Sequence, residues 1–313
     1  MARHTPPRPV ALEKVFPQLK PLSRQALRLH PRAGDPSYED SSVGGPLRWP
    51  IDEPWPWCSE EHYNIGDGGD NPENDTRHQA AEPMVPVVQL YATDALGLPF
   101  PPGSDLLQVL WCPFHHGEPW YERSVRARVF WRKAVDASCV LVAPPVPVDA
   151  PEGHVPKPCA VHPELVTEYP GRDDIPRELR NEVGNRLNGL NETTGWDYFY
   201  HLSTAPGTKV GGHPRGWNGS TTGFSCDRCG APVEHLLTVT HGEFDGESWR
   251  SWLPVEDRPD DDSGPLHLWN PGSERARDAQ NAHCLEVGGG GDVYVFECHS
   301  CPDRPTETLF NLN

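Results

Sequence analysis

The sequence has no long apolar run and an excess of acidic over basic residues. No stretch reaches the roughly 20 apolar residues of a membrane-spanning helix, so we expect no membrane association. The start, Met1–Pro7, lacks the apolar core of a signal peptide, which favours a cytoplasmic protein. Lys and Arg total 27 against 45 Asp and Glu, giving a net charge of -18. Because such a chain repels phosphate backbones, we expect no nucleic-acid partner.

Familiar catalytic motifs are also missing from the sequence. It contains neither the Gly-x-Ser-x-Gly nucleophile elbow nor the His-Glu-x-x-His zinc motif. We therefore assign no catalytic and no cofactor-binding residues, and expect a binding protein rather than an enzyme. The alternative is a hydrolase-type enzyme with a histidine and a carboxylate in a cleft. Its candidate residues are His213, His241, Glu243 and Asp245.

Proline (37 residues) and glycine (29) are abundant. Proline removes a backbone donor and clashes with the preceding helical turn, so long helices cannot dominate. We predict an α+β fold that is predominantly antiparallel β. One amphipathic helix is expected between Ile175 and Leu190, where apolar residues fall three to four apart. Residues 11–29 could hold one or two short helices. Strands are predicted at 84–91, 106–111, 127–131, 139–142, 236–239 and 292–297.

Several sequence elements occur twice in the same order. Val43-Gly44-Gly45 recurs as Val210-Gly211-Gly212, and each copy leads to a cysteine-bearing loop, a strand after proline and a strand running into cysteine. We predict an internal pseudo-duplication of two β-rich halves. The predicted regions are an N-terminal extension (1–35), the first half (36–143), a connector with the helix (144–207) and the second half (208–313).

Four of the nine cysteines form two Cys-x-x-Cys pairs, Cys226 with Cys229 and Cys298 with Cys301. Two thiols spaced in this way can bind one metal ion from a single turn, and the following Gly230 suits a zinc knuckle. We predict a structural Zn²⁺ site of four cysteines that clips the C-terminal strand to the second half. Buried thiols without a ligand are the main alternative, and a redox pair is less favoured.

Cys58 and Cys112 occupy the corresponding places in the first half. With His62, His115 and His116 they could form a second, degenerate metal site. Buried cysteine without a ligand is the commoner explanation for such residues, and the sequence leaves both open.

The repeated elements resemble known protein families. Ser42–Pro46, Trp55–Cys58 and Pro86–Leu90 resemble the YwqG-like family of uncharacterised bacterial proteins. Lys209–Pro214, the cysteine pairs and Val293–Phe296 resemble both that family and the C-terminal domain of the eukaryotic programmed cell death 2 proteins. The chain departs from the eukaryotic pattern because it has no MYND-type zinc finger.

The resemblance implies a protein-binding or chaperone-like role, since the eukaryotic relatives escort a newly made ribosomal protein. Some bacterial members are suspected of toxin-immunity roles, which is a further alternative. We expect an acidic cleft or an exposed strand edge between the halves to hold a protein or peptide partner by strand addition. The net negative charge favours a basic partner, although it could serve only to keep the protein in solution. The sequence does not indicate an oligomeric state.

Overall fold

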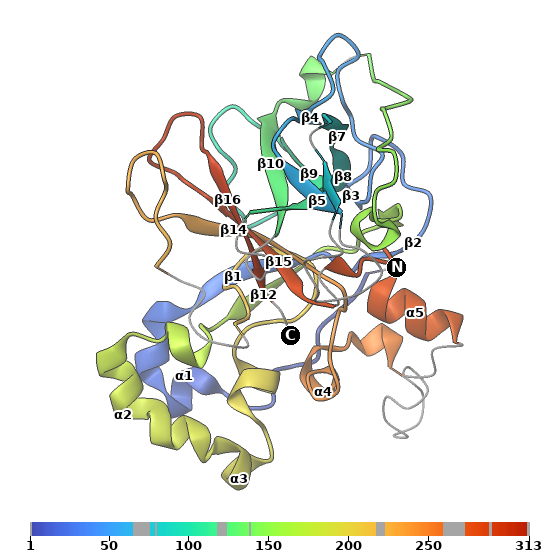
Figure 1. Cartoon of the computed structure of the whole chain (residues 1–313). Coiled ribbons are helices and arrows are strands. Elements are labelled where there is room, and N and C mark those ends of the chain that lie inside the picture. The colour runs from blue at the N-terminus through green and yellow to red at the C-terminus, as the bar shows by residue number, and fades with distance from the viewer. Residues whose placement is uncertain are drawn as a thin grey trace.

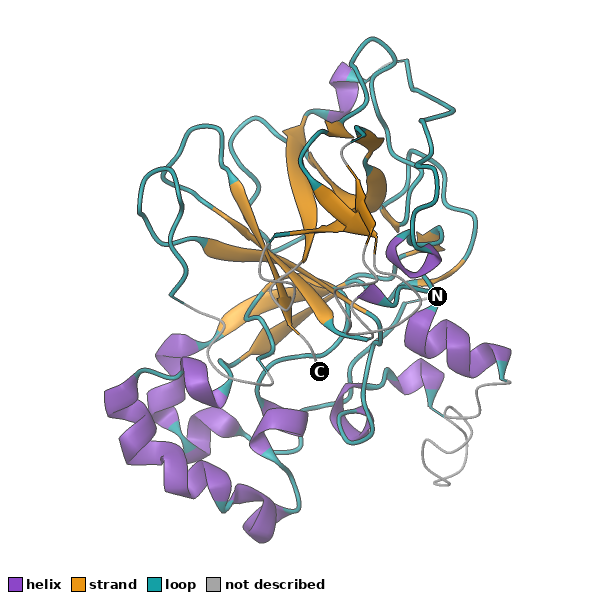
Figure 2. Ribbon diagram, viewed as in Figure 1, coloured by secondary structure: helices purple, strands orange, loops and turns teal. Residues whose placement is uncertain are grey.

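The structure, a computed structural model, is a mixed α/β chain with mostly antiparallel strands and short helices (Figures 1 and 2). This confirms the prediction of a fold with both helices and strands in which the sheets are mostly antiparallel. The structure describes residues 2–64, 76–78, 80–117, 124–137, 139–216, 223–258, 273–287 and 290–311.

One sheet draws its strands from the N-terminal, central and C-terminal parts of the chain. They are Arg24–Arg28 (β1), Glu164–Glu168 (β12), Lys209–Gly211 (β13), Glu234–Thr240 (β14), Asp292–Glu297 (β15) and Thr306–Asn311 (β16). Their order is β12-β1-β13-β14-β15-β16, and neighbouring strands are antiparallel. Strand pairing therefore joins the predicted N-terminal extension and connector to the second half.

The second sheet is built around the long strand β9. Its strands are Arg32–Ala33 (β2), Ser42–Val43 (β3), His62–Asn64 (β5), Thr76–His78 (β6), Val85–Tyr91 (β8), Leu106–His116 (β9), Ser124–Arg132 (β10) and Cys159–Ala160 (β11). The order is β2-β11-β3-β8-β9-β5-β6, and β10 pairs with β9. Two short strands pair separately, Trp57–Cys58 (β4) and Glu82–Pro83 (β7).

The predicted strands at 84–91, 106–111, 127–131, 236–239 and 292–297 are confirmed, with ends that differ by a few residues. The strand predicted at 139–142 is wrong, because only a single bridge forms there, between Pro50 and Val140. Two backbone hydrogen bonds join the run to residues 49–51, but Val142 is 86% exposed and prolines follow at 144 and 145, so the pairing does not extend into a strand.

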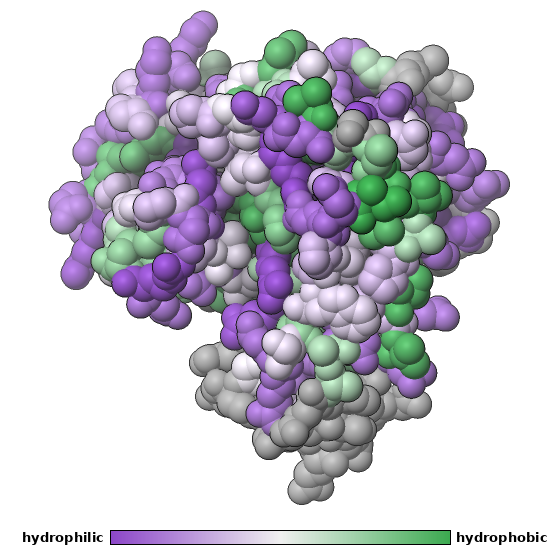
Figure 3. All heavy atoms as spheres, turned by 90° about the horizontal axis from the view of Figure 1, so that it is seen from above, coloured by the Kyte–Doolittle hydropathy of each residue, from purple (hydrophilic) through white to green (hydrophobic). Residues whose placement is uncertain are grey.

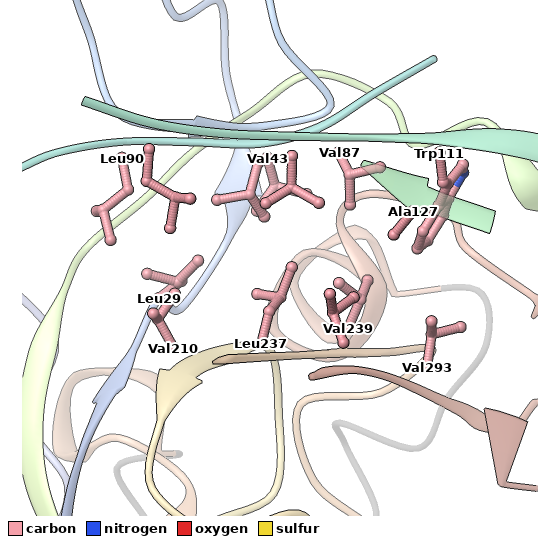
Figure 4. Packing of buried hydrophobic residues seen from close by; sticks show 14 of the residues in the cluster. Leu29, Val43, Val87, Leu90, Trp111, Ala127, Val210, Leu237, Val239 and Val293 are labelled. Atoms are coloured by element: carbon pink, nitrogen blue, oxygen red, sulfur yellow. The ribbon is translucent and has the colours of Figure 1, made fainter. Parts of the chain in front are cut away.

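Apolar side chains from the two sheets face each other and form one core (Figure 4). Val43, Val87 and Leu90 project from one side, and Val210 and Leu237 from the other. All five side chains are less than 5% exposed. Burying each one stabilises the fold by about 1.5–3 kcal/mol relative to leaving it in water. The two sheets therefore share a hydrophobic core.

Short helices pack around a separate apolar cluster at one end of the molecule (Figures 1 and 2). Val183 and Leu187 of the predicted helix are buried there, so this helix is confirmed. For residues 11–29 only the first part is helical, and the rest forms β1. The helices at this end are Leu12–Val15 (α1), Pro17–Leu22 (η1), Arg172–Asp174 (η6), Arg177–Asn188 (α2), Leu190–Thr194 (α3) and Tyr198–Leu202 (η7).

The remaining helices lie along loops. They are Ala134–Asp136 (η4), Glu152–His154 (η5), Trp249–Trp252 (α4), Val255–Asp257 (η8) and Glu274–Asn281 (α5). Within the described ranges, no helix combines the length and apolar character that crossing a membrane requires. On the face shown in Figure 3, hydrophobic residues form small separate patches among hydrophilic ones.

Candidate metal centres

The two Cys-x-x-Cys pairs lie together in the structure and form a four-cysteine cluster of Cys226, Cys229, Cys298 and Cys301. All four sulfur atoms are within 4.8 Å of one another. Across the pairs, the sulfur atoms of Cys229 and Cys298 are 3.6 Å apart, although the two residues are 69 positions apart in the chain. Cys226 and Cys298 are buried, whereas Cys229 is exposed. Two distant segments thus present four thiols to one point, as the spacing predicted.

A tight turn presents the first pair of cysteines. The backbone N–H of Gly230 donates to the carbonyl of Cys226 at 2.8 Å, and the N–H of Cys226 donates to Ala231 O at 2.8 Å. Gly230 has a φ of 70°, a left-handed conformation that glycine adopts without strain. This glycine allows the chain to reverse immediately after Cys229, so that both sulfurs point the same way.

The end of β15 presents the second pair. Cys298 follows Glu297 directly, and its N–H donates to Pro305 O at 2.9 Å. A turn then closes through the N–H of Arg304, which donates to Cys301 O at 3.0 Å. The hydrogen-bonded strand β15 therefore fixes where this pair lies.

The two cysteines that follow β15 differ in acidity. Burial opposes ionisation of Cys298, but N–H groups of Cys301 and Ser300 donate to its sulfur and lower its pKa to about 7. The neighbouring Cys229 and burial together raise the pKa of Cys301 to about 12. A divalent cation bound to the sulfurs would favour the thiolate form of each.

A second cluster draws its residues from β4, β5 and β9. One ligand atom from each of Cys58, His62, Cys112 and His116 lies within 4.8 Å of the others. All four residues are at most 2% exposed, and Cys58 Sγ is 3.7 Å from His116 Nε2. His115 is not part of this group, because its ring packs against His154 at a centroid distance of 4.7 Å.

A distortion of β9 brings Cys112 and His116 together. Residues four apart in a regular strand are separated by roughly 13 Å, which is too far for both side chains to bind the same metal ion. Here Ser124 of β10 pairs with His116 and Arg126 pairs with Cys112, so two steps along β10 match four along β9. The extra residues include Pro113, which has no N–H for the ladder. This bulge shortens the path between the two side chains.

The two cysteines of this second cluster titrate as a pair. The Cys112 thiol beside Cys58 lowers the pKa of Cys58 to about 4, against the effect of burial. The same contact raises the pKa of Cys112. One thiolate and one thiol thus face two imidazoles, a donor set that Zn²⁺ binds readily. The sequence contained a signal for it, because Cys58–His62 and Cys112–His116 have equal spacing.

A groove of about 350 Å³ lies between residues of the two sheets. Its lining includes Leu98, Phe100 and Trp131 from the earlier part of the sequence and Gly211 and Leu236 from much later in the chain. Its charged residues are of both signs, so the groove is not lined by acid alone; they are Arg24, Glu234, Glu297, His299 and Arg304. A cleft was expected, but its lining residues were not predictable from the sequence, because they come together only where the sheets meet.

The four-cysteine cluster and the groove share a segment of chain. Glu297 and His299 flank Cys298 and line the groove. The Glu297 side chain is 1% exposed, and its Oε2 accepts a hydrogen bond from Arg304 Nη2 at 2.5 Å. Binding of one metal ion by the four cysteines would therefore also fix the position of one wall of the groove.

The proposed histidine and carboxylate residues do not all converge. His241 and Asp245 line one cavity of about 140 Å³, smaller than the roughly 300–1,000 Å³ of ordinary small-molecule sites. His213 is buried elsewhere and its Nε2 donates to Leu22 O at 2.9 Å. Glu243 is buried and accepts the Thr208 N–H at 2.9 Å. Burial raises the pKa of Glu243 and lowers that of His213 to about 3.

No protein-family model matches the chain, and no curated protein matches it significantly. Function must therefore be inferred from the two side-chain clusters and the groove.

Proposed function

We propose that this protein is a non-enzymatic, chaperone-like binding module of the YwqG-like type. A structural Zn²⁺ ion held by Cys226, Cys229, Cys298 and Cys301 fastens its second half. The groove between the halves holds a segment of a protein partner, and a toxin bound by an immunity protein would be one such partner. The observation that carries the proposal is that the wall of the groove is continuous with the turn that bears Cys298 and Cys301.

Matching strand orders support the internal duplication. The series β2-β11-β3-β8-β9-β10 corresponds to β12-β1-β13-β14-β15-β16, with antiparallel pairing throughout. Ser42 pairs with Gln89 as Lys209 pairs with Thr238. The register of β8 shifts just after Pro86, as that of β14 shifts after His235. Gly44, which follows β3, and Gly212, which follows β13, both have a positive φ.

The donor set supports zinc in the second half. Four thiolates in a closed set match a structural zinc site, and the ligands leave no position for a substrate. Because the cysteines come from two distant segments and converge only in the folded chain, the free energy of binding one ion would add to that of folding and would fix the turn. The site would hold Glu297 and His299 in place along the groove.

The chemistry of the groove supports a peptide-like ligand with an apolar anchor. Leu98, Phe100 and Leu236 offer an apolar floor, while Glu234, 62% exposed, offers a negative charge at the side. With the net charge of -18, this favours an anchor residue flanked by Lys or Arg. Shape and charge at the anchor would provide selectivity.

The test is to select peptides from a random phage-displayed library on the full-length, zinc-loaded protein. We expect sequences with an apolar or aromatic anchor and basic neighbours. Leu98→Glu places a charge in the groove and should weaken their binding by at least about tenfold, since 1.4 kcal/mol is a factor of ten. Leu96→Glu is the matched control, because Leu96 is 75% exposed and does not line the groove. Equal binding by both variants would refute the proposal.

A further inference from the structure

We infer that Cys58, His62, Cys112 and His116 form a second structural zinc site, with two cysteine and two histidine ligands. This goes beyond the proposed function, which needs only the four-cysteine site and the groove. Each of the four residues places a ligand atom within 4.8 Å of the other three. They come from β4, β5 and β9, so one ion would join three strands.

Burial makes this cluster different from a surface group of histidines. Each member is at most 2% exposed, and the ring of His62 stacks on Phe114 at a centroid distance of 4.7 Å. Charged or polar groups placed in such surroundings destabilise the fold unless they are paired. A bound Zn²⁺ would use all four donors at once and neutralise the charge of the two thiolates.

The histidine hydrogen bonds select the tautomer that a metal site requires. His62 Nδ1 is 3.0 Å from Glu60 O, and His116 Nδ1 is 3.0 Å from Glu61 O. A carbonyl oxygen only accepts, so each Nδ1 carries the proton and each neutral ring keeps its lone pair on Nε2. Most metal-binding histidines donate their other ring N–H to a carboxylate, a backbone carbonyl or water, which fixes the orientation of the ring. Consecutive carbonyls orient both rings here.

Position in the repeated scaffold gives independent support. Cys112 lies in β9 and Cys298 directly follows β15, and these strands have matching places in the two sheets. Cys58 lies between β3 and β8, as Cys226 lies between β13 and β14. The second half has Cys-x-x-Cys at both places, and the first half has Cys-x-x-x-His at both. Each half therefore has one clip at the same point, with a different donor set.

A complete set of four protein ligands makes the site structural. It leaves no open coordination position for water or substrate, which catalytic zinc requires. The ion would hold β4 and β5 against the bulged part of β9. It would thus stabilise the irregular strand that places Cys112 and His116 together.

Zinc content and X-ray absorption of the full-length wild-type protein test this without any substitution. The chain is expressed with zinc, freed of loosely bound metal and measured for zinc per chain. We expect two ions. With both sites filled, six sulfurs and two nitrogens surround the two ions, so the average shell is three sulfurs to one nitrogen.

Substitutions then show which residues bind each zinc ion. Cys58→Ala with Cys112→Ala should lower the zinc content from two ions to one and leave an all-sulfur shell. Cys159→Ala is the matched control, because Cys159 is fully buried but belongs to neither cluster. It should keep two ions and the mixed shell. If the double variant does not fold, the wild-type measurement still decides.

The outcomes separate this site from the four-cysteine site. One ion with four sulfurs, or two ions without nitrogen ligands, would overturn the second site and leave the four-cysteine proposal intact. One ion with two sulfurs and two nitrogens would support the second site and overturn the four-cysteine proposal. A Cys58–Cys112 disulfide found by peptide mapping of the protein purified with reductant would also overturn it.

Discussion

The indole Nε1 of Trp131, on β10, donates a hydrogen bond of 2.6 Å to Oε1 of Glu297, on β15. This bond crosses between the two sheets and lies at the groove, next to the turn that begins at Cys298. The ring of Phe100 packs edge-on against Trp131 at a centroid distance of 5.1 Å. Trp131 thus joins the two sheets, lines the groove and supports the segment that carries Cys298.

Trp131→Phe is expected to destabilise the protein by about 1–3 kcal/mol. It keeps an aromatic ring but removes a hydrogen bond to a buried carboxylate, which is the cost expected for such a loss. Urea unfolding of the full chain measures it. Trp57→Phe is the control, since Trp57 is 47% exposed and a surface change should cost less than about 0.5 kcal/mol. Equal effects would show that the Trp131–Glu297 bond contributes nothing.

Removal of metal should lower the melting temperature and release the peptides selected on the groove. A ligand present at about 1,000 times its Kd stabilises the native state by about 4.1 kcal/mol, which a strong chelator would remove. Added Zn²⁺ should restore both properties. Cys301→Ser should bind peptide weakly even with zinc, whereas Cys284→Ser, at an exposed cysteine outside the clusters, should behave as wild type. Tight peptide binding by chelated protein would contradict this link.

Local sequence patterns predicted most of the strands well. They failed where residues far apart in the chain determine whether a segment forms a strand. The alternation in β15 and the apolar run in β8 are visible in the sequence. The strand β1 is not, because it contains Arg28, which is fully buried and donates to Trp252 O at 2.8 Å. No pattern identifies a buried arginine before its acceptors are known. The run at 139–142 misled for the opposite reason: its apolar pattern is typical of a strand, but it pairs with Pro50 through a single bridge.

Spacing predicted the grouping of the four cysteines in the second half, whereas the second cluster needed the structure. Two residues between thiols fit one turn whatever follows, so these pairs were recognisable. Both His115 and His116 were candidates from the sequence, although only His116 repeats, from Cys112, the spacing of Cys58 and His62. The bulge in β9 decides between them, because it turns His116 towards Cys112 and leaves His115 against His154.

The paired glycines offer a test of the repeated turn. A Cβ added at Gly212, where φ is 69°, would lie 2.6 Å from Ala26 Cβ and would also overlap the buried Glu168 carboxylate. We expect Gly212→Ala to destabilise by more than about 3 kcal/mol, the sum of backbone strain and overpacking. At Gly44 a Cβ would meet backbone atoms of Lys157, with the same result.

Gly195→Ala separates the two causes in the glycine test. Gly195 has a φ of 74° but nothing within 4 Å of an added Cβ, so only the backbone strain of about 1–2 kcal/mol applies. Differential scanning calorimetry of the three variants should rank Gly195→Ala as the mildest. A Gly212→Ala protein as stable as the Gly195→Ala protein would mean that the turn tolerates a side chain.

Acidification should destabilise the protein through its buried histidines. Burial lowers the pKa of His30 and of His213 to about 3, and that of His283 to about 4, from 6.5. Below pH 6.5 the unfolded chain binds protons that the folded chain does not, so this contribution is complete above pH 6.5 and is lost as pH falls towards 3. Each histidine should contribute a slope of about 1.4 kcal/mol per pH unit within that window.

His213→Gln isolates one of these contributions. The glutamine amide can donate to Leu22 O as His213 Nε2 does, but it does not titrate. Urea unfolding between about pH 6 and about pH 5 should give a slope lower than that of wild type by about 1.4 kcal/mol per pH unit. Loss of zinc at low pH affects both proteins alike, so the difference reports the histidine. Identical slopes would show that His213 is protonated in the folded protein, against its burial.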